Sequence, residues 1–325
     1  MESNSSCPCC GSLEARPYWA LVAPFLRNYA LGTNAPYTAQ LRECRQCGHR
    51  FFRERFTTEE MENIYGGYRN RTYLKTRQKL EPWYTARLNG AGMEQSQINR
   101  RQEQLRNLLL EAGWKPGEKR VVLDVGGDVG QNIPLDLAKA AYLLEVSDRQ
   151  ITPGVQRVKA LTEVPESIGL ILCLHVIEHL PNPEALLREW SASGKLGTDC
   201  IIILEVPLER PHLLPLLSSK LYRGWLEFVG RFLPLTIALD ACATAARGLL
   251  RLVMPPLFLK LHEHVQFFTE RSLAQFASQA GLNIIRLETT RGSSLLTHQG
   301  AISLVGRLTN SSSLCRLGGK VDNLP

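Results

Sequence analysis

Four short, continuously apolar segments constrain the fold of this 325-residue chain more than any other feature. Runs of this kind are typical of strands buried on both faces of a parallel sheet, because a strand with one solvated face alternates in polarity. Two further segments near the end of the chain have the form of a final strand pair. The sequence therefore predicts an α/β fold with a Rossmann-like sheet. The six expected strands span residues 120–125, 141–146, 169–174, 201–206, 283–288 and 301–307.

The remaining residues suggest how the chain is divided. The first segment contains five cysteines and little periodicity, and the second shows helical spacing of leucines after an N-cap at Thr57. A leucine-rich stretch with five prolines interrupts the α/β part. We expect a cysteine module at 1–56, a helical linker or lid at 57–117, an α/β domain at 118–310 with a helical insertion at 208–260, and a tail at 311–325.

Composition narrows the cellular setting and the partners. A hydrophobic fraction of 44% excludes global disorder, and nine cysteines without a secretory signal predict a reducing, cytoplasmic location. Phe232 to Ala246 is the longest apolar stretch, but Pro234 and Asp240 interrupt it, and it falls short of the roughly 20 residues that span a bilayer. We predict no transmembrane segment, while contact of 208–260 with a membrane surface stays open.

A glycine-rich loop follows the first expected strand. Residues 124–130 read Asp-Val-Gly-Gly-Asp-Val-Gly and precede an expected helix, and glycines at such a place let the backbone turn sharply and approach a ligand. Glu145 ends the next strand, where a carboxylate can accept hydrogen bonds from both hydroxyls of a ribose. These features predict a nucleoside-containing cofactor. The alternative is a tight turn that binds nothing.

The carboxylates of this loop discriminate between two cofactors. A dinucleotide fingerprint reads G-x-G-x-x-G, whereas this chain has G-G-x-x-G with Asp124 before it and Asp128 inside it. Two carboxylates repel a pyrophosphate but suit the sulfonium and ammonium groups of S-adenosylmethionine. We therefore predict S-adenosylmethionine rather than NAD as the cofactor.

These motifs, taken with three others, resemble class I S-adenosylmethionine-dependent methyltransferases. More narrowly, they are similar to the branch with an N-terminal zinc-binding domain, which includes sugar C-methyltransferases and enzymes of polysaccharide and natural-product clusters. The resemblance covers about residues 7–306. The three further motifs are the run from His175 to Pro183, Glu205-Val206-Pro207, and the run from His262 to Thr269.

The resemblance implies roles for individual residues. Asp124, Gly126 and Gly130 would line the methionine end of the cofactor together with the intervening Gly127, Glu145 would hold the ribose, and His175 would lie in the cleft above the fourth strand. Tyr68 belongs to a tyrosine pair, with Tyr65, that would close over cofactor or substrate; ordinary packing is the alternative. Glu263 and His264 would supply a general base, although Leu261 stands where the sugar C-methyltransferases carry a tyrosine. Methyl transfer to a hydroxyl or an enolisable carbon needs such a base.

The run His175-x-x-Glu178-His179 also matches a zinc-protease pattern. That motif requires a helix, so that both histidines face one metal ion. Here His175 ends an apolar strand, and prolines at 181 and 183 follow closely. We expect a strand-to-turn site at the carboxyl edge of the sheet, where α/β proteins bind ligands.

Two C-x-x-C-G motifs predict a second, structural metal site. Cys7 and Cys10 form one motif and Cys44 and Cys47 the other, and together they supply a closed tetrahedral zinc site. Cys9 could replace Cys10, but the glycine after Cys10 favours Cys10. Because all four ligands come from the protein, this Zn²⁺ would stabilise structure or present loops rather than catalyse. A redox dithiol is the alternative.

The sequence thus predicts a methyltransferase acting on a C or O atom of a small, sugar-like or nucleotide-sugar acceptor. Fourteen Lys and Arg against eight Asp and Glu between Arg42 and Arg106 admit an anionic acceptor, although a solvated helix face rich in arginine is the preferred interpretation of this run. The leucines of 208–260 admit a lipid-linked acceptor. A nucleic-acid-modifying enzyme is the main alternative, but no aromatic and basic array of the kind that stacks bases is present. A non-catalytic partner subunit would not need the glycines and Glu145.

Overall fold

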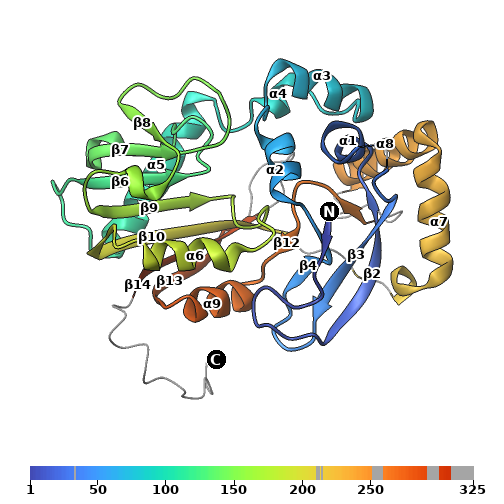
Figure 1. Cartoon of the computed structure of the whole chain (residues 1–325). Helices are drawn as coiled ribbons and strands as arrows, with labels where there is room; N and C mark the ends of the chain where they lie inside the picture. The colour runs from blue at the N-terminus through green and yellow to red at the C-terminus, as the bar shows by residue number, and fades with distance from the viewer. Residues whose placement is uncertain (33, 210–212, 214, 251–258, 291–299, 309–325) are drawn as a thin grey trace.

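The computed structural model of the chain describes residues 1–32, 34–209, 213, 215–250, 259–290 and 300–308. Its strands form two large sheets that lie side by side, with helices packed around them (Figure 1). The tail expected at 311–325 and residues 251–258 of the expected insertion lie outside the described residues.

The larger sheet has seven strands and confirms the predicted Rossmann-like α/β fold. Its first five strands in chain order are parallel, whereas β14 pairs antiparallel with both of its neighbours. The carboxyl ends of parallel strands meet at one edge, so the loops after β6, β7 and β9 come together there. Across the sheet the order is β13 (Leu282–Thr290), β14 (Gly300–Leu308), β10 (Leu196–Leu208), β9 (Ile168–Leu174), β6 (Arg120–Val125), β7 (Ala138–Leu144) and β8 (Val155–Val158).

Helices cover both faces of this sheet. Leu105 and Leu109 of α5 (Gln95–Glu111) pack on one face in a cluster with Val122 of β6. On the other face, α6 (Pro183–Ala192) and α9 (Glu270–Gln279) contribute Trp190 and Phe276 to a second cluster. Successive strand residues point to opposite faces, and continuous apolar runs supply both clusters.

The connection between β6 and β7 differs from the expectation. All of its residues are described, yet it contains only a 3₁₀ turn at Leu135–Leu137, so the predicted helix after the glycine loop is wrong. Pro134 cannot donate a backbone hydrogen bond and interrupts the short segment before Ala138. The side chain of Ile133 joins the cluster formed by α5, which covers this face instead.

The smaller sheet is built from both ends of the chain. Three strands come from the cysteine-rich segment, and two short strands come from residues that follow the helical insertion. Sequence boundaries at 1–56 do not show this union, because pairing between distant segments leaves no local pattern. In order across the sheet the strands are β11 (Lys260–Leu261), β2 (Ala15–Val22), β3 (Thr38–Cys44), β4 (Arg50–Phe52) and β12 (Gln266–Phe267).

The remaining elements lie around the smaller sheet and above the larger one (Figure 1). Thr57 caps α2 through a capping box with Glu60, as its sequence predicts. None of the helices in the described part of the chain combines the length and apolarity that a bilayer-spanning segment requires. These elements are β1 (Glu2–Ser3), α1 (Pro24–Leu26), β5 (Glu54–Arg55), α2 (Thr58–Tyr65), α3 (Arg71–Leu80), α4 (Ala86–Asn89), α7 (Lys220–Arg231) and α8 (Leu233–Leu250).

Candidate active site

The glycine loop turns away from the end of β6 with three residues in the left-handed region. Gly126 has a φ of 66° and Gly130 a φ of 76°, and Asp128 adopts 58° without being a glycine. A Cβ atom on Gly126 would lie 2.6 Å from a methyl group of Val176. The loop therefore passes directly beneath the segment that follows β9.

Asp124 lies under this loop rather than on its surface. The side chain is fully buried, and neither carboxylate oxygen has a hydrogen-bond partner among the described residues. A Cβ atom on Gly127 would fall 2.0 Å from Asp124 Oδ2, so only glycine fits there. Burial, followed by the negative charge of Glu145, raises the pKa of Asp124 to about 8.

Glu145 follows β7 and faces the same loop. Its Oε2 accepts a hydrogen bond of 3.0 Å from the amide of Asp128, and its Oε1 accepts one of 2.9 Å from the amide of Ser147. Each carboxylate oxygen has a second acceptor position. Glu145 thus fixes the loop while keeping acceptor capacity for a ligand.

Two arginines neutralise the carboxylate inside the loop. Asp128 pairs with Arg69 at 3.1 Å and also with Arg149. Arg69 precedes α3 and donates a further hydrogen bond of 3.0 Å to the carbonyl of Ala91. The segment between α2 and α5 is therefore attached to the glycine loop, as the predicted lid would require.

A cavity of about 730 Å³ joins these parts into one site. This volume lies within the usual range for small-molecule pockets. Of the predicted cofactor-binding residues, Gly126, Gly127, Glu145, His175 and Tyr68 line it, whereas Asp124 and Gly130 do not. The polar face of α5 also lines it, with Gln97, Arg100, Arg101 and Gln104.

His175 stands at the end of β9 and is held by two carboxylates. Its φ of 58° is unusual for a residue with a side chain and marks a constrained position. Its Nε2 lies 3.0 Å from Glu205 Oε1 and its Nδ1 3.5 Å from Glu178 Oε1, while 48% of the side chain is exposed. Although burial favours the neutral form, the neighbouring carboxylates of Glu178 and Glu205 raise the pKa of His175 to about 10.

Glu205 on β10 is itself fixed from two sides. Arg101 of α5 forms an ion pair with its Oε1, and Ser303 of β14 donates a hydrogen bond of 2.7 Å to its Oε2. Burial opposes the charged form, but His175 and Arg101 lower the pKa of Glu205 to about 2. Sequence reasoning named Glu205 as part of a motif without giving it a role, and it missed Arg101.

The rings of His179 and His264 contact each other close to Glu178, the partner of His175. Their ring centroids are 4.6 Å apart, and His179 lines the cavity whereas His264 does not. His264 Nδ1 lies 3.1 Å from Glu209 Oε2, and this carboxylate raises the pKa of His264 to about 9 against the effect of burial. Tyr65 lies 2.7 Å from His179 Nδ1. The structure therefore brings three predicted residues, His175, His264 and Tyr65, close to one histidine cluster.

Glu263 points into a different environment. Its carboxylate accepts hydrogen bonds from Tyr73 and, at 3.1 Å, from Arg77, both of α3. Burial opposes the charged form, but Arg77 and then His262 lower the pKa of Glu263 to about 2. Glu263 does not line the cavity. It links the predicted lid to the segment between β11 and β12.

The four predicted metal-binding cysteines converge. Their Sγ atoms lie within 4.8 Å of one another, with Cys7 and Cys47 at 3.6 Å and Cys10 and Cys44 at 3.5 Å. Cys9 turns away and donates to the carbonyl of Ser272 at 3.1 Å. Of the two open possibilities, the geometry selects Cys10 for the cluster.

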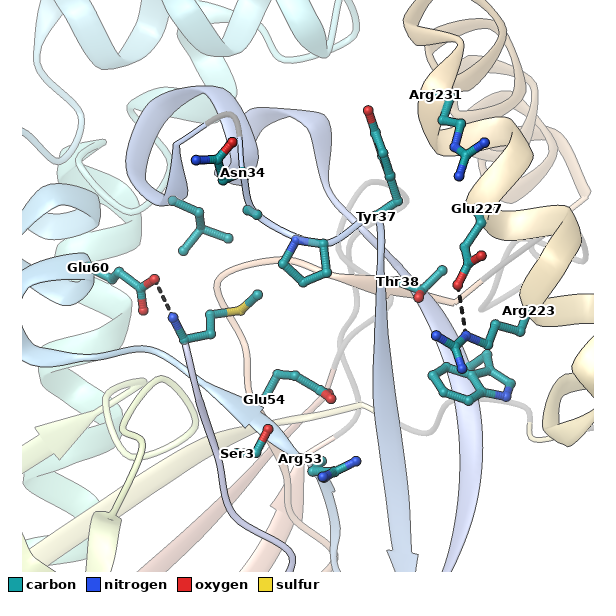
Figure 2. A pocket seen from close by; sticks show the side chains of 15 residues that line it. Ser3, Asn34, Tyr37, Thr38, Arg53, Glu54, Glu60, Arg223, Glu227 and Arg231 are labelled. Carbon is teal, nitrogen blue, oxygen red and sulfur yellow. Dashed lines mark hydrogen bonds and ion pairs between the residues drawn. The ribbon is translucent and has the colours of Figure 1, made fainter.

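A second cavity, of about 790 Å³, lies between the smaller sheet and α7 (Figure 2). The ammonium group of Met1 pairs with Glu60 on one side, and Arg223 pairs with Glu227 on the other. None of the predicted site residues lines this cavity, and it shares no lining residue with the cavity at the glycine loop.

Comparison with known proteins identifies the family. The model of a methyltransferase domain matches residues 97–287. No curated protein matches the chain. Three solved structures are similar to parts of it at low identity. Magnesium protoporphyrin IX methyltransferase from Synechocystis PCC 6803 is 13% identical over 66% of this chain and 84% of its own, with a TM-score of 0.39.

Two further solved structures have the same degree of similarity. The N-methyltransferase NodS from Bradyrhizobium japonicum WM9 is 11% identical over 65% of this chain and 97% of its own, with a TM-score of 0.36. The 1,6-didemethyltoxoflavin N1-methyltransferase from Burkholderia thailandensis is 13% identical over 65% of this chain and 78% of its own, with a TM-score of 0.39. The family match spans more than half of the chain, which therefore belongs to the methyltransferase-domain family and is a methyltransferase of the predicted α/β fold.

Proposed function

We propose that the chain transfers a methyl group from S-adenosylmethionine to a C or O atom of a small, sugar-like acceptor. The observation that carries this proposal is the single cavity of about 730 Å³ that the glycine loop, Glu145 and His175 line together. Glu145 would accept hydrogen bonds from the ribose, and Asp124 beneath Gly127 would favour a cation above the loop.

The acceptor would enter from the side of His175 and His179. We propose that His175 contacts the reacting atoms, since it faces the cavity and is fixed between Glu178 and Glu205. His264 would act through His179, and Glu263 would position the lid through Tyr73 and Arg77. Arg100 on the cavity wall supports an acceptor with an anionic group.

We further propose that the four clustered cysteines hold a structural Zn²⁺ ion. A zinc–sulfur distance of about 2.3 Å places tetrahedral sulfur ligands about 3.8 Å apart, close to the two measured separations. In each motif the glycine is left-handed and closes the turn, by bonds from Gly11 to Cys7 and from Gly48 to Cys44. The thiol set and its turns therefore fit the ion.

The test measures cofactor binding and methyl transfer separately. Isothermal titration should show S-adenosylmethionine binding, and labelled cofactor should transfer its methyl group to an acceptor in a set of sugar nucleotides or a lysate, with the product identified by mass. Glu145→Ala should weaken binding about tenfold to hundredfold, because hydrogen bonds to a carboxylate are lost. Glu166→Gln, which alters an exposed pair with Lys139, is the matched control. Absence of binding at millimolar cofactor would overturn the proposal.

A further inference from the structure

The structure contains a second group of metal-binding side chains, next to the cofactor cavity. Glu178, His179 and His264 each offer one ligand atom, and these atoms lie within 4.8 Å of one another. The sequence motif His175-x-x-Glu178-His179 alone did not predict this group, because His264 lies 85 positions further along the chain. His264 is brought to this group by the segment between β11 and β12, on which it lies.

The surroundings of the Glu178 carboxylate are the main observation that points to a bound ligand. Its side chain is 1% exposed, and neither oxygen has a hydrogen-bond partner in the described part of the chain. Imidazole nitrogens lie near its Oε1, at 3.5 Å in His175 and 3.8 Å in His179. A buried carboxylate without hydrogen bonds is costly unless a charge lies against it; His175 supplies one such charge, and a metal ion would supply a stronger one.

The two histidines are oriented as metal ligands commonly are. His264 Nδ1 faces the carboxylate of Glu209 at 3.1 Å, which leaves Nε2 as the free nitrogen. His179 Nδ1 lies 3.1 Å from the carbonyl of Glu263 and 2.7 Å from the hydroxyl of Tyr65. A proton on Nδ1 would be donated to this carbonyl and would leave Nε2, which lies 3.8 Å from Glu178 Oε1, as the free nitrogen. A ligand histidine usually donates its second nitrogen to a carboxylate or carbonyl in this way.

The backbone fixes the carboxylate relative to the second histidine. The amides of Val265 and Gln266 both donate to the carbonyl of Glu178, at 2.9 and 3.0 Å. These bonds hold the turn after β9 against the residue next to His264. The group is thus assembled by two segments that are distant in sequence and rigidly joined.

We propose that Glu178, His179 and His264 bind a divalent transition-metal ion of the Zn²⁺ class, whose open coordination positions face the cofactor cavity. Ligands at about 2.0–2.1 Å from a metal lie roughly 3.4 Å apart in a tetrahedral site and about 4.2 Å apart across an octahedral one. The separation of 3.8 Å between Glu178 Oε1 and His179 Nε2 falls within this range. Two imidazoles and one carboxylate suit zinc, manganese or iron better than magnesium or calcium.

Such an ion deepens the proposed function, on which this role rests. A metal ion bound beside the cavity would coordinate a hydroxyl oxygen of the acceptor and lower the pKa of that hydroxyl. The oxygen would release its proton to solvent and attack the methyl carbon. The carbon–sulfur electron pair would stay on sulfur, giving the methylated acceptor, S-adenosylhomocysteine and one proton.

Metal stoichiometry of the full-length protein tests the site independently of activity. We expect two Co²⁺ ions per chain after removal of metal by a chelator and titration, one with the thiolate charge-transfer band of the cysteine cluster and one without it. Glu178→Gln and His264→Asn should each lose the second ion and keep the thiolate band, which reports that the module is folded. His262→Gln, whose ring nitrogen lies 3.0 Å from Glu81, is the matched control and should keep both ions.

The outcomes separate this inference from the proposed function. One ion in the wild type, or two in Glu178→Gln, overturns the metal site. Calorimetry with S-adenosylmethionine on the same protein reports the proposed function alone. Cofactor binding without a second ion therefore contradicts only the proposed metal site. A second ion without cofactor binding contradicts only the methyltransferase chemistry proposed for that ion.

Discussion

Gly127 is the residue at which the glycine loop is most sensitive to a single atom. An added Cβ would lie 2.0 Å from the carboxylate of Asp124, and this carboxylate is enclosed and cannot move away. We expect Gly127→Ala to abolish measurable S-adenosylmethionine binding by calorimetry and to lower the melting temperature. Gly224→Ala, in the open part of α7, is the matched control and should stabilise the fold by about 0.5–1 kcal/mol. Wild-type affinity in Gly127→Ala would show that the loop does not contact the cofactor.

Asp124 makes cofactor affinity depend on pH at the same scale. Its pKa of about 8 reflects burial and the charges of Glu145 and Asp128, with Arg101 opposing them. A cation above the loop favours the ionised form, so binding lowers this pKa and releases a proton below about pH 8. The affinity for S-adenosylmethionine should therefore rise as pH rises and level off above about pH 8. The total increase should be about tenfold for each unit by which binding lowers the pKa of Asp124.

The measurement for Asp124 is calorimetry of S-adenosylhomocysteine and S-adenosylmethionine in two buffers with different ionisation enthalpies. The wild type should release protons with the sulfonium compound near neutral pH, and Asp124→Asn should not. An unchanged proton release in Asp124→Asn would assign the effect to another group.

At the scale of elements, the cysteine module and the catalytic edge of the sheet are joined through β12. His49 of the module lies 2.8 Å from the side chain of Gln266, and the backbone amide of Gln266 donates to the backbone carbonyl of Glu178. Arg55 adds a second link, since it donates to the carbonyls of Ser6 and Pro181. A metal ion bound by the cysteines would therefore stabilise the turn after β9 as well as its own loops.

Cys44→Ser tests this coupling. We expect loss of the thiolate-bound metal, a lower melting temperature and weaker methyl transfer, because β3 and β4 no longer hold β12 in place. Metal content by mass spectrometry, thermal unfolding and transfer of a labelled methyl group measure the three effects. Cys242→Ser, at an exposed position of α8, is the matched control. Full metal content and full activity in Cys44→Ser would show that the module neither binds the ion nor supports the site.

The elements show what the sequence could and could not predict. Strand β9 and its neighbours were predictable, because a strand buried on both faces must be apolar throughout. Strand β8 was not, since its central Gln156 and Arg157 are exposed at the edge of the sheet. The expected helix after the glycine loop was wrong because α5, which precedes β6, covers that face.

At the scale of the whole molecule, the convergence of the glycine-loop residues was predictable from the sequence, whereas the convergence of the histidine cluster was not. Gly126, Gly127 and Glu145 lie at the ends of two neighbouring parallel strands that are adjacent in the chain, so their convergence follows from local order. Contacts such as His264 with His179, or Arg101 with Glu205, join segments about 85 and 104 positions apart, and only the packed sheet brings them together. Residue types alone predicted candidates for this part of the site but not which of them line the cavity.

The buried ion network around Glu81 joins α3 to the segment that begins at β11 and provides the last test. Glu81, after α3, is 2% exposed and lies 2.7 Å from Arg77, 3.0 Å from His262 and 3.1 Å from Lys260. Glu81→Gln removes the carboxylate that these three side chains share, although Lys260 keeps Asp240 and Arg77 keeps Glu263. Removing one partner of a buried pair costs about 3–5 kcal/mol. Chemical denaturation should show this loss, whereas Glu184→Gln, in an exposed pair, should cost about 1 kcal/mol or less. Because Arg77 also holds Glu263, Glu81→Gln should weaken methyl transfer too; equal stability of both variants would mean that solvent already screens the network.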